Sequence, residues 1–421
     1  MERLPGFRDF YPEPLPQPDM WSADARQYIF NQWRATARRY GFREYDGPPL
    51  EPLELFTLKS GQEIVGQLYN FKDKGDRDIS LRPEMTPTLA RMIAAHERSY
   101  KKPVKWFAIP QLFRYERQQR GRLHEHFQFN ADIIGESDLA ADAELIALLI
   151  DTLRSLGLTD SDFVIRLSSR NAWHDFFVGK KGDPAREYDF YQAVDKFDPK
   201  KPEESEGKLT AIGISLEDVS HFIEKSQPTA ELQTILDNLA ARRLRDYVKV
   251  DYHVIRGLAY YTGVVFEAFD CAGEFRAIAG GGRYDNLIKL ISGGKVNLPA
   301  LGFGMGDVVL RLLLGERGKL PNFGAILDAF FLIEDESLRS ESLKAIQDLR
   351  TAGVAVDYSF TAAKSDKQFK RAQELKAANT VRLERNAVGE IGAKIKNLKT
   401  REEKTSSLGD AVKYLHRSAD L

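Results

Sequence analysis

The sequence is poor in the residues on which several classes of protein depend. It has a single cysteine, Cys271, among 421 residues, so it cannot build an intramolecular disulfide or a cysteine-based zinc site. No run of about 18 uncharged apolar residues occurs, and charged residues appear at the very start. These absences exclude a disulfide scaffold and a zinc finger, and we expect a cytoplasmic protein without a membrane partner.

An excess of charge of one sign is also missing. The 61 Lys and Arg residues face 62 Asp and Glu, which leaves a net charge of -1 when the seven histidines are neutral. A protein that binds a polyanion through its whole surface carries a strong positive excess. Any contact with nucleic acid must therefore come from a local patch.

The sequence also lacks several common enzyme motifs. It contains no HExxH metal pair, and no Ser-His-Asp or Cys-His set stands out. Two glycine-rich segments, 277–288 and 299–307, follow neither the phosphate-loop spacing nor the dinucleotide-binding one. Their glycines bring the backbone close either to a ligand or to another strand.

The periodicity of apolar residues indicates an α+β fold in the first part of the chain. Residues 25–37 are apolar at every fourth position and Gly41 follows, which predicts an amphipathic helix. Residues 127–133 alternate, with apolar side chains at odd positions and Gln128 and Asp132 on the opposite face, which predicts a strand. Because no regular βαβ period is present, an antiparallel sheet is favoured over a doubly wound parallel one.

Helix caps are predicted at three places. Thr86 followed by Pro87 indicates a helix start, and Ser137 precedes a long apolar helix. Ser365 with Gln368 three residues later has the pattern of a capping box.

Changes in composition divide the chain into two or three domains, as its length also suggests at about 150 residues each. Residues 171–245 are rich in Asp, Glu and Lys and read as a helical insertion into a domain formed by 1–170 and 246–320. A small α/β domain is predicted for 321–421. Its segment from Lys364 to Lys404 holds twelve basic and six acidic residues, for which a solvated helix face is the simplest interpretation.

Arginines gather among glycines and carboxylates. They are Arg82, Arg114, Arg117, Arg120, Arg122, Arg256 and Arg283. Arginine binds phosphate and carboxylate in a planar, bidentate way, so the pattern indicates a polyanionic small ligand. Surface ion pairs with neighbouring glutamates are the alternative for each of them. Function is favoured for Arg114 and Arg256, which lie in apolar or glycine-bearing strand contexts.

Six segments together resemble a known family. They are LPGFRDFYPE, SLRPEMTPTLAR, FRYERQQRGRLHEHFQFNADIIGE, RGLAYYTGVVFEAF, AIAGGGRYDNL and KSDKQFKRAQELKAAN. The third is similar to motif 2 of class II aminoacyl-tRNA synthetases, and the fourth and fifth are similar to segments specific to the histidyl-tRNA synthetases. The resemblance covers nearly the entire chain.

The resemblance implies a class II catalytic domain around an antiparallel sheet, with the helical insertion and a C-terminal α/β anticodon-binding domain. It implies ATP-dependent activation of L-histidine to an adenylate, assisted by Mg²⁺ and without a general base or a metal held by the protein alone. The histidyl group then passes to the 3′ end of tRNA(His). Pro48 matches the dimer-interface motif, so a homodimer is implied.

The resemblance also assigns roles residue by residue. The catalytic residues would be Arg256 and Arg114. ATP would be bound by Arg114, Glu116, Arg122 and His126. Histidine would be bound by Glu84, Thr86, Gln128, Asp132, Arg256, Tyr260, Tyr261 and Tyr284. The tRNA would contact Gln119, Arg120, Lys367, Lys370 and Arg371.

Several positions depart from the pattern of the family. Val309 stands where the third class motif has an arginine, and Arg311 lies on a different helix face. His126 replaces a phenylalanine, Asp132 a glutamate and Ala259 an aspartate.

Two alternatives stay open, and the loss of that arginine favours the first of them. One is a synthetase-like regulatory subunit of ATP phosphoribosyltransferase, which binds histidine and does not aminoacylate. The other is a tRNA-binding protein with an inactive core. The retained arginines and the basic C-terminal domain favour the synthetase.

Overall fold

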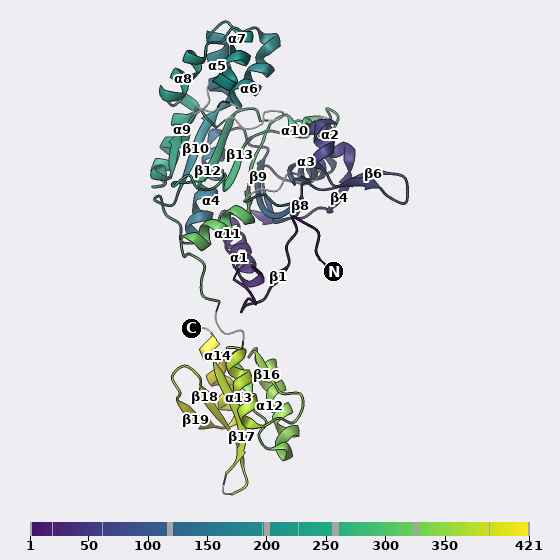
Figure 1. Cartoon of the computed structure of the whole chain (residues 1–421), viewed down its shortest axis with the longest axis vertical. Helices are drawn as coiled ribbons and strands as arrows, with labels where there is room; N and C mark the ends of the chain where they lie inside the picture. Colours follow the sequence, from purple (N-terminus) through teal and green to yellow (C-terminus); the bar gives the residue numbers. More distant parts are fainter. Residues whose placement is uncertain are drawn as a thin grey trace. The chain divides into compact units, whose positions relative to one another are not determined.

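The computed structural model divides into two compact units, Met1–Pro321 and Asn322–Leu421 (Figure 1). It describes residues 2–18, 20–60, 62–115, 121–195, 197, 203–225, 227–254, 261–323, 327–386 and 388–419. Five predicted site residues lie outside these ranges, namely Glu116, Gln119, Arg120, Arg256 and Tyr260. Within the described ranges, no helix is both long and apolar enough to cross a bilayer.

A nine-stranded sheet forms the centre of the first unit. Its order is β11 (Val248–Val250), β10 (Phe163–Ser169), β12 (Val264–Asp270), β13 (Ala279–Arg283), β14 (Ala300–Gly306), β9 (Glu125–Ile134), β7 (Val104–Ala108) and β3 (Arg43–Glu44), and β8 (Gln111–Phe113) also pairs with β9. The β11–β10 and β3–β7 pairs at its edges are parallel and the others are antiparallel. The predicted antiparallel α+β fold is confirmed.

Helices cover the apolar face of this sheet. α1 (Ala23–Arg39) begins at the cap Ser22 and is followed by Gly41 at a φ of 76°, as the sequence predicts. Its Trp33 stacks on Phe129 of β9, with ring centroids 5.6 Å apart. α4 (Leu139–Ser155), with apolar residues nearly all round, joins the same core. The side chains at odd positions of β9 are thus buried against these helices, and the side chains at even positions lie on the opposite side of the sheet.

Smaller elements complete the first unit. A three-stranded sheet joins β4 (Leu50–Pro52), β6 (Asp78–Leu81) and β5 (Asn70–Lys72), and β1 (Phe10–Tyr11) pairs with β2 (Trp21–Ser22). The remaining helices are α2 (Leu53–Ser60), α3 (Thr86–Ala95), α5 (Arg170–Gly179), α6 (Glu187–Asp195), α7 (Glu203–Ala211), α8 (Leu216–Lys225), α9 (Ala230–Ala241), α10 (Leu287–Ile291) and α11 (Asp307–Glu316). In Figure 1, α5 to α8 gather beyond one end of the sheet. They occupy the segment where an insertion is predicted, and the domain boundaries stay a prediction.

The second unit is a small α/β fold. Its sheet has the order β16 (Val356–Tyr358), β15 (Ala329–Phe331), β17 (Asn379–Arg385), β18 (Ile391–Asn397) and β19 (Glu403–Ser406). The first three strands are parallel and the last two are antiparallel additions. The helices are α12 (Arg339–Thr351), α13 (Ser365–Glu374) and α14 (Leu408–Ala419).

The predicted caps at Thr86, Ser137 and Ser365 are wrong. α3 begins with Thr86 as its first residue and has no side-chain cap, while Asp138 caps α4 by accepting from the Ala140 amide. Ser365 is the first residue of α13 and caps nothing, since its hydroxyl donates to Glu334. Gln368 is buried and exchanges two hydrogen bonds with the backbone of Ile333. Gln368 thus ties α13 to the end of a strand instead of closing its own first turn.

Candidate active site

Glycines make room for polar side chains at the centre of the sheet. A Cβ atom at Gly302 of β14 would lie 1.9 Å from Asp132 Oδ1, and one at Gly304 would lie 2.7 Å from Gln128 Cδ. Gly281 of β13 allows the backbone of the neighbouring strand to come close, since a Cβ atom at this position would lie 2.2 Å from the Gly302 carbonyl oxygen. Close approach to another strand therefore applies at all three positions, and close approach to a ligand stays a prediction.

Two cavities adjoin above these strands. The larger has a volume of about 500 Å³ and the smaller about 100 Å³. They share Arg114, Gln128, Gly280 and Gly304. A ligand in one cavity would therefore lie next to a ligand in the other, with Arg114 at their junction.

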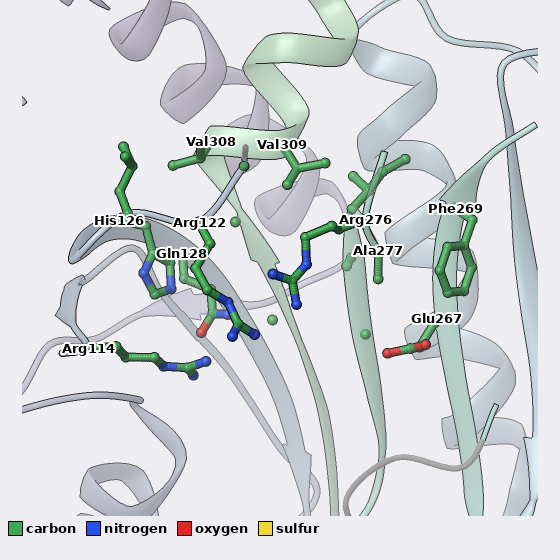
Figure 2. Close-up of a pocket in the computed structure, with 17 residues that line it drawn as sticks. Arg114, Arg122, His126, Gln128, Glu267, Phe269, Arg276, Ala277, Val308 and Val309 are labelled. Atoms are coloured by element: carbon green, nitrogen blue, oxygen red, sulfur yellow. The ribbon is translucent and has the colours of Figure 1, made fainter. Parts of the chain in front are cut away.

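The larger cavity is rich in arginine. Figure 2 shows the guanidinium groups of Arg114, Arg122 and Arg276 pointing into it from different walls. Glu267 is the one carboxylate among the described residues that line it. The Arg114 Nε donates to the Pro83 carbonyl oxygen at 3.0 Å, which orients its guanidinium group. This excess of positive charge suits a ligand with several phosphate groups.

His126 contributes a neutral ring to the same cavity. Burial, together with the positive charges of Arg114, Arg8 and Arg122, lowers the pKa of His126 to about 3. The imidazole is therefore uncharged at neutral pH, and a flat neutral ring can stack on a base.

The smaller cavity is lined by polar groups. They include Glu84, Thr86, Gln128, Asn130, Tyr261 and Tyr284. The Tyr284 hydroxyl donates to Asp132 Oδ1 at 2.5 Å, while Asp132 Oδ2 is buried and has no hydrogen-bond partner among the residues that the structure describes. Burial raises the pKa of Asp132 to about 7, against the effect of the Tyr284 hydroxyl. Asp132 itself is not among the described residues that line this cavity.

Two arginines of the predicted cluster have structural partners instead. Arg82 Nη1 contacts Asp46 Oδ1 at 2.9 Å and the Gly47 carbonyl oxygen at 2.7 Å. Arg283 pairs with Asp142 and lines neither cavity. Both arginines do form ion pairs, but they are buried and their partners are aspartates far away in sequence, not the neighbouring surface glutamates of the alternative interpretation.

A buried charge cluster supports the site and was missed by the sequence analysis. Arg8 Nε lies 2.6 Å from Glu125 Oε1, and its Nη1 lies 2.8 Å from Asp307 Oδ2. The Phe127 amide donates to Asp307 Oδ1 at 2.9 Å. Arg8 therefore connects the start of β9 to the first residue of α11, beside the larger cavity. Only its position in LPGFRDFYPE pointed to it.

The model of the family described as "Histidyl-tRNA synthetase" matches residues 17–307. The chain belongs to the histidyl-tRNA synthetase family. A protein of Opitutus terrae named histidine–tRNA ligase is 42% identical over 424 residues, covering 96% of this chain and 95% of the relative. One of Thermoplasma volcanium with the same name is 36% identical, covering 99% of both. A histidyl-tRNA synthetase structure from Nostoc has a TM-score of 0.77 at 21% identity and 97% coverage of both chains.

Family membership confirms the resemblance to histidyl-tRNA synthetases and the class II fold. The structure brings most of the described predicted residues to the two cavities: Glu84, Thr86, Arg114, Arg122, His126, Gln128, Tyr261 and Tyr284. Asp132 lies behind Gly302 and Tyr284. Arg276 and Glu267 line the larger cavity and were not predicted. The one feature of the sequence that could have pointed to Arg276 is its position just before the glycines of β13.

The raised pKa of Asp132 predicts a specific dependence of stability on pH. Its native pKa of about 7 exceeds the ordinary 3.8, so the unfolded chain loses this proton first as pH rises. The free energy of unfolding therefore falls as the pH rises from about 4 to about 7. Between pH 5 and pH 8 this fall amounts to about 2–3 kcal/mol. Asp132→Asn should lack this loss.

Urea unfolding followed by tryptophan fluorescence measures it, because all four tryptophans lie in the first unit. Asp142→Asn is the comparison, because burial also raises the pKa of Asp142, to about 6. This variant shows how much of the pH dependence comes from a second buried aspartate. Equal pH dependence in wild type and Asp132→Asn would contradict the assignment.

Proposed function

We propose that this chain is a histidine–tRNA ligase that activates L-histidine with ATP and transfers it to the 3′ end of tRNA(His). The observation that carries the proposal is the pair of adjoining cavities with Arg114 between them, one cationic and one lined by carboxylate, amide and hydroxyl groups. ATP fits the larger cavity and histidine the smaller. The curated relatives with this name match nearly the whole chain.

In the first step, a carboxylate oxygen of histidine attacks the α-phosphorus of ATP. The bond from that phosphorus to the oxygen bridging to the β-phosphate breaks, and pyrophosphate leaves with the electron pair. No proton moves, so catalysis needs orientation and stabilisation of phosphate charge. Arg114 at the junction is suited to hold the α-phosphate, and Arg122 the phosphates beyond it. In the second step, the terminal ribose hydroxyl attacks the carbonyl carbon, AMP leaves, and the hydroxyl proton is released.

Mg²⁺ fits this cavity as a companion of ATP. Within the part of the chain that the structure describes, no three His, Cys, Asp or Glu residues gather to hold a metal. Mg²⁺ commonly binds through one or two carboxylates and the phosphates of a substrate. Glu267 would supply the carboxylate, and the ion would neutralise phosphate charge.

Histidine recognition rests on the smaller cavity. Asp132, whose Oδ1 accepts from the Tyr284 hydroxyl and whose buried Oδ2 has no hydrogen-bond partner among the described residues, would accept from an imidazole N–H. Glu84, Thr86, Gln128 and Tyr261 line the rest of the cavity, where the α-ammonium group would bind. A site that hydrogen-bonds a polar ring discriminates strongly against apolar analogues.

The test is histidine-dependent exchange between pyrophosphate and ATP, followed by charging of tRNA(His) with the same preparation. Exchange with histidine alone among the amino acids, and charging, would support the ligase. Histidine binding without exchange would favour the regulatory subunit instead. That alternative gains from Val309 but is less supported, because the matches to histidine–tRNA ligases include the second unit.

We further propose that α13 of the second unit contacts tRNA. Its Lys367, Lys370 and Arg371 are exposed and lie on neighbouring turns of one face. Replacing all three by glutamine should weaken tRNA binding and reduce the slope of log K against log salt by about 2–3, because each phosphate contact releases counterions. Filter binding at several salt concentrations measures this.

The control for that experiment is Lys344→Gln with Arg350→Gln on α12. An unchanged slope in the triple variant would place tRNA elsewhere. Gln119 and Arg120 stay proposed contacts of the acceptor end.

A homodimer is also proposed. Pro48 is exposed between β3, at an edge of the large sheet, and β4, and Leu50 beside it is 41% exposed. Exposed apolar residues at a sheet edge suit an interface between two copies. Sedimentation equilibrium tests it, with a monomer across micromolar concentrations as the contrary result. A cytoplasmic location stays a prediction.

A further inference from the structure

The larger cavity receives no cation from α11. The first residues of this helix present Val308 and Val309 to the cavity, and Val309 Cγ2 would lie 3.2 Å from a Cβ atom on Gly121. Val309 therefore packs against the end of the loop that precedes β9. This wall is apolar beside a space that, under the proposed function, holds a triphosphate.

Arg276 supplies a cation next to that wall. In Figure 2 it lies below Val309, and its guanidinium group points into the cavity, as that of Arg122 does from another wall. Arg276 lies on the turn between β12 and β13 and is exposed to solvent, so an anion can reach it. The Ile278 amide donates to the Ala268 carbonyl oxygen at 2.8 Å, which anchors this turn two residues away.

The placement of the three arginines along the cavity separates their roles. Arg114 lines both cavities and so lies nearest to the histidine site. Arg122 and Arg276 line the larger cavity alone. With His126 neutral, the described residues that line the larger cavity include three guanidinium groups and the carboxylate of Glu267 alone. The end of the larger cavity away from the histidine site thus holds two positive charges. The leaving pyrophosphate would lie at this end.

We propose that Arg276 is a catalytic residue of the adenylation step that binds the β- or γ-phosphate of ATP, at the wall where α11 presents Val309. This inference rests on the proposed function. Negative charge builds on the pyrophosphate oxygens as the bond to the α-phosphorus breaks. A guanidinium group stays protonated and offers a planar pair of N–H donors to those oxygens. Arg276 thereby stabilises the leaving group without moving a proton.

The test is the Arg276→Ala variant of the full chain. In pyrophosphate exchange, kcat/KM for ATP should fall by about 100-fold, while KM for histidine stays within about twofold. Arg276→Lys should recover part of the loss, because lysine keeps the charge but not the planar pair of donors. Adding Val309→Arg to Arg276→Ala should also recover activity, since it returns a cation to the same wall.

Arg154→Ala is the matched control. Arg154 is an exposed arginine on α4, pairs with Asp151 at 2.7 Å and lines neither cavity. Its replacement should leave both steady-state constants unchanged. Circular dichroism should show native folding of each variant.

A second readout separates this inference from the proposed function. Binding of Mg²⁺ with a non-hydrolysable ATP analogue, measured by equilibrium dialysis, should weaken at least about tenfold in Arg276→Ala. An inactive wild type with this weakened binding would refute the ligase and support the phosphate contact. Unchanged binding and exchange in the variant would overturn the inference. Loss of charging with unchanged exchange would assign Arg276 to the tRNA end and overturn it as well.

Discussion

Replacement of Arg114 by alanine is expected to lower histidine-dependent pyrophosphate exchange by about 10³-fold. Among the described residues, Arg114 is the arginine that lines both cavities, so its guanidinium group lies where the two substrates would meet. Removing a preorganised donor from such a site weakens the transition state more than either ground state. The loss should therefore appear mainly in kcat. Steady-state exchange at varied ATP and histidine measures the separate constants.

Two further variants sharpen this experiment. Arg114→Lys should stay far below wild type, since a point charge cannot keep the contact of Nε with the Pro83 carbonyl oxygen and also bind phosphate. Arg154→Ala is the control here as well, because Arg154 pairs with Asp151 near the surface and lines neither cavity. Exchange within about threefold of wild type in Arg114→Ala would remove this residue from the reaction centre.

Replacement of Arg8 by methionine is expected to destabilise the first unit by about 3–5 kcal/mol. The side chains of Arg8 and Glu125 are each 1% exposed, and that of Asp307 is 5% exposed. Methionine has a similar volume but no charge, so two buried carboxylates would face each other without a cation. Urea unfolding monitored by tryptophan fluorescence at pH 7.5 measures the change.

Arg3, an exposed arginine five residues before Arg8, provides the comparison. Arg3 pairs with Asp9 at 3.4 Å, and both side chains are more than half exposed. Arg3→Met should therefore change stability by no more than about 0.5 kcal/mol. Adding Glu125→Gln and Asp307→Asn to Arg8→Met should recover part of the loss, because no buried charge then remains. A loss below about 1 kcal/mol in the single variant would mean that water reaches the cluster.

Local periodicity was sufficient to predict the elements nearest the site. The helix of residues 23–39 and the strand of residues 125–134 follow from apolar spacings of four and two, which depend only on backbone geometry. The strand pattern also placed Gln128 and Asp132 on one face before any fold was known. Ordered motifs along the chain then pointed to the family, since they preserve residue types together with their spacing.

The caps show where local reasoning fails. Ser365 and Gln368 have the spacing of a capping box, yet the Gln368 amide binds the backbone of Ile333. A buried amide binds whichever partner satisfies both its donor and its acceptor, and a strand end of the second unit does so. That partner lies 35 residues away in sequence, which no local window includes.

Residue order was thus enough to predict the sheet-forming and helix-forming segments, the absence of a disulfide framework and the family. Which charges act together became clear from the folded arrangement. It buried Arg8 against Glu125 and Asp307, tied Arg82 and Arg283 to structural partners, and set Arg276 beside Val309 in the larger cavity. The reason is that secondary structure follows from neighbours along the chain. The partner of a charge, in contrast, is set by desolvation and contact between segments far apart in sequence.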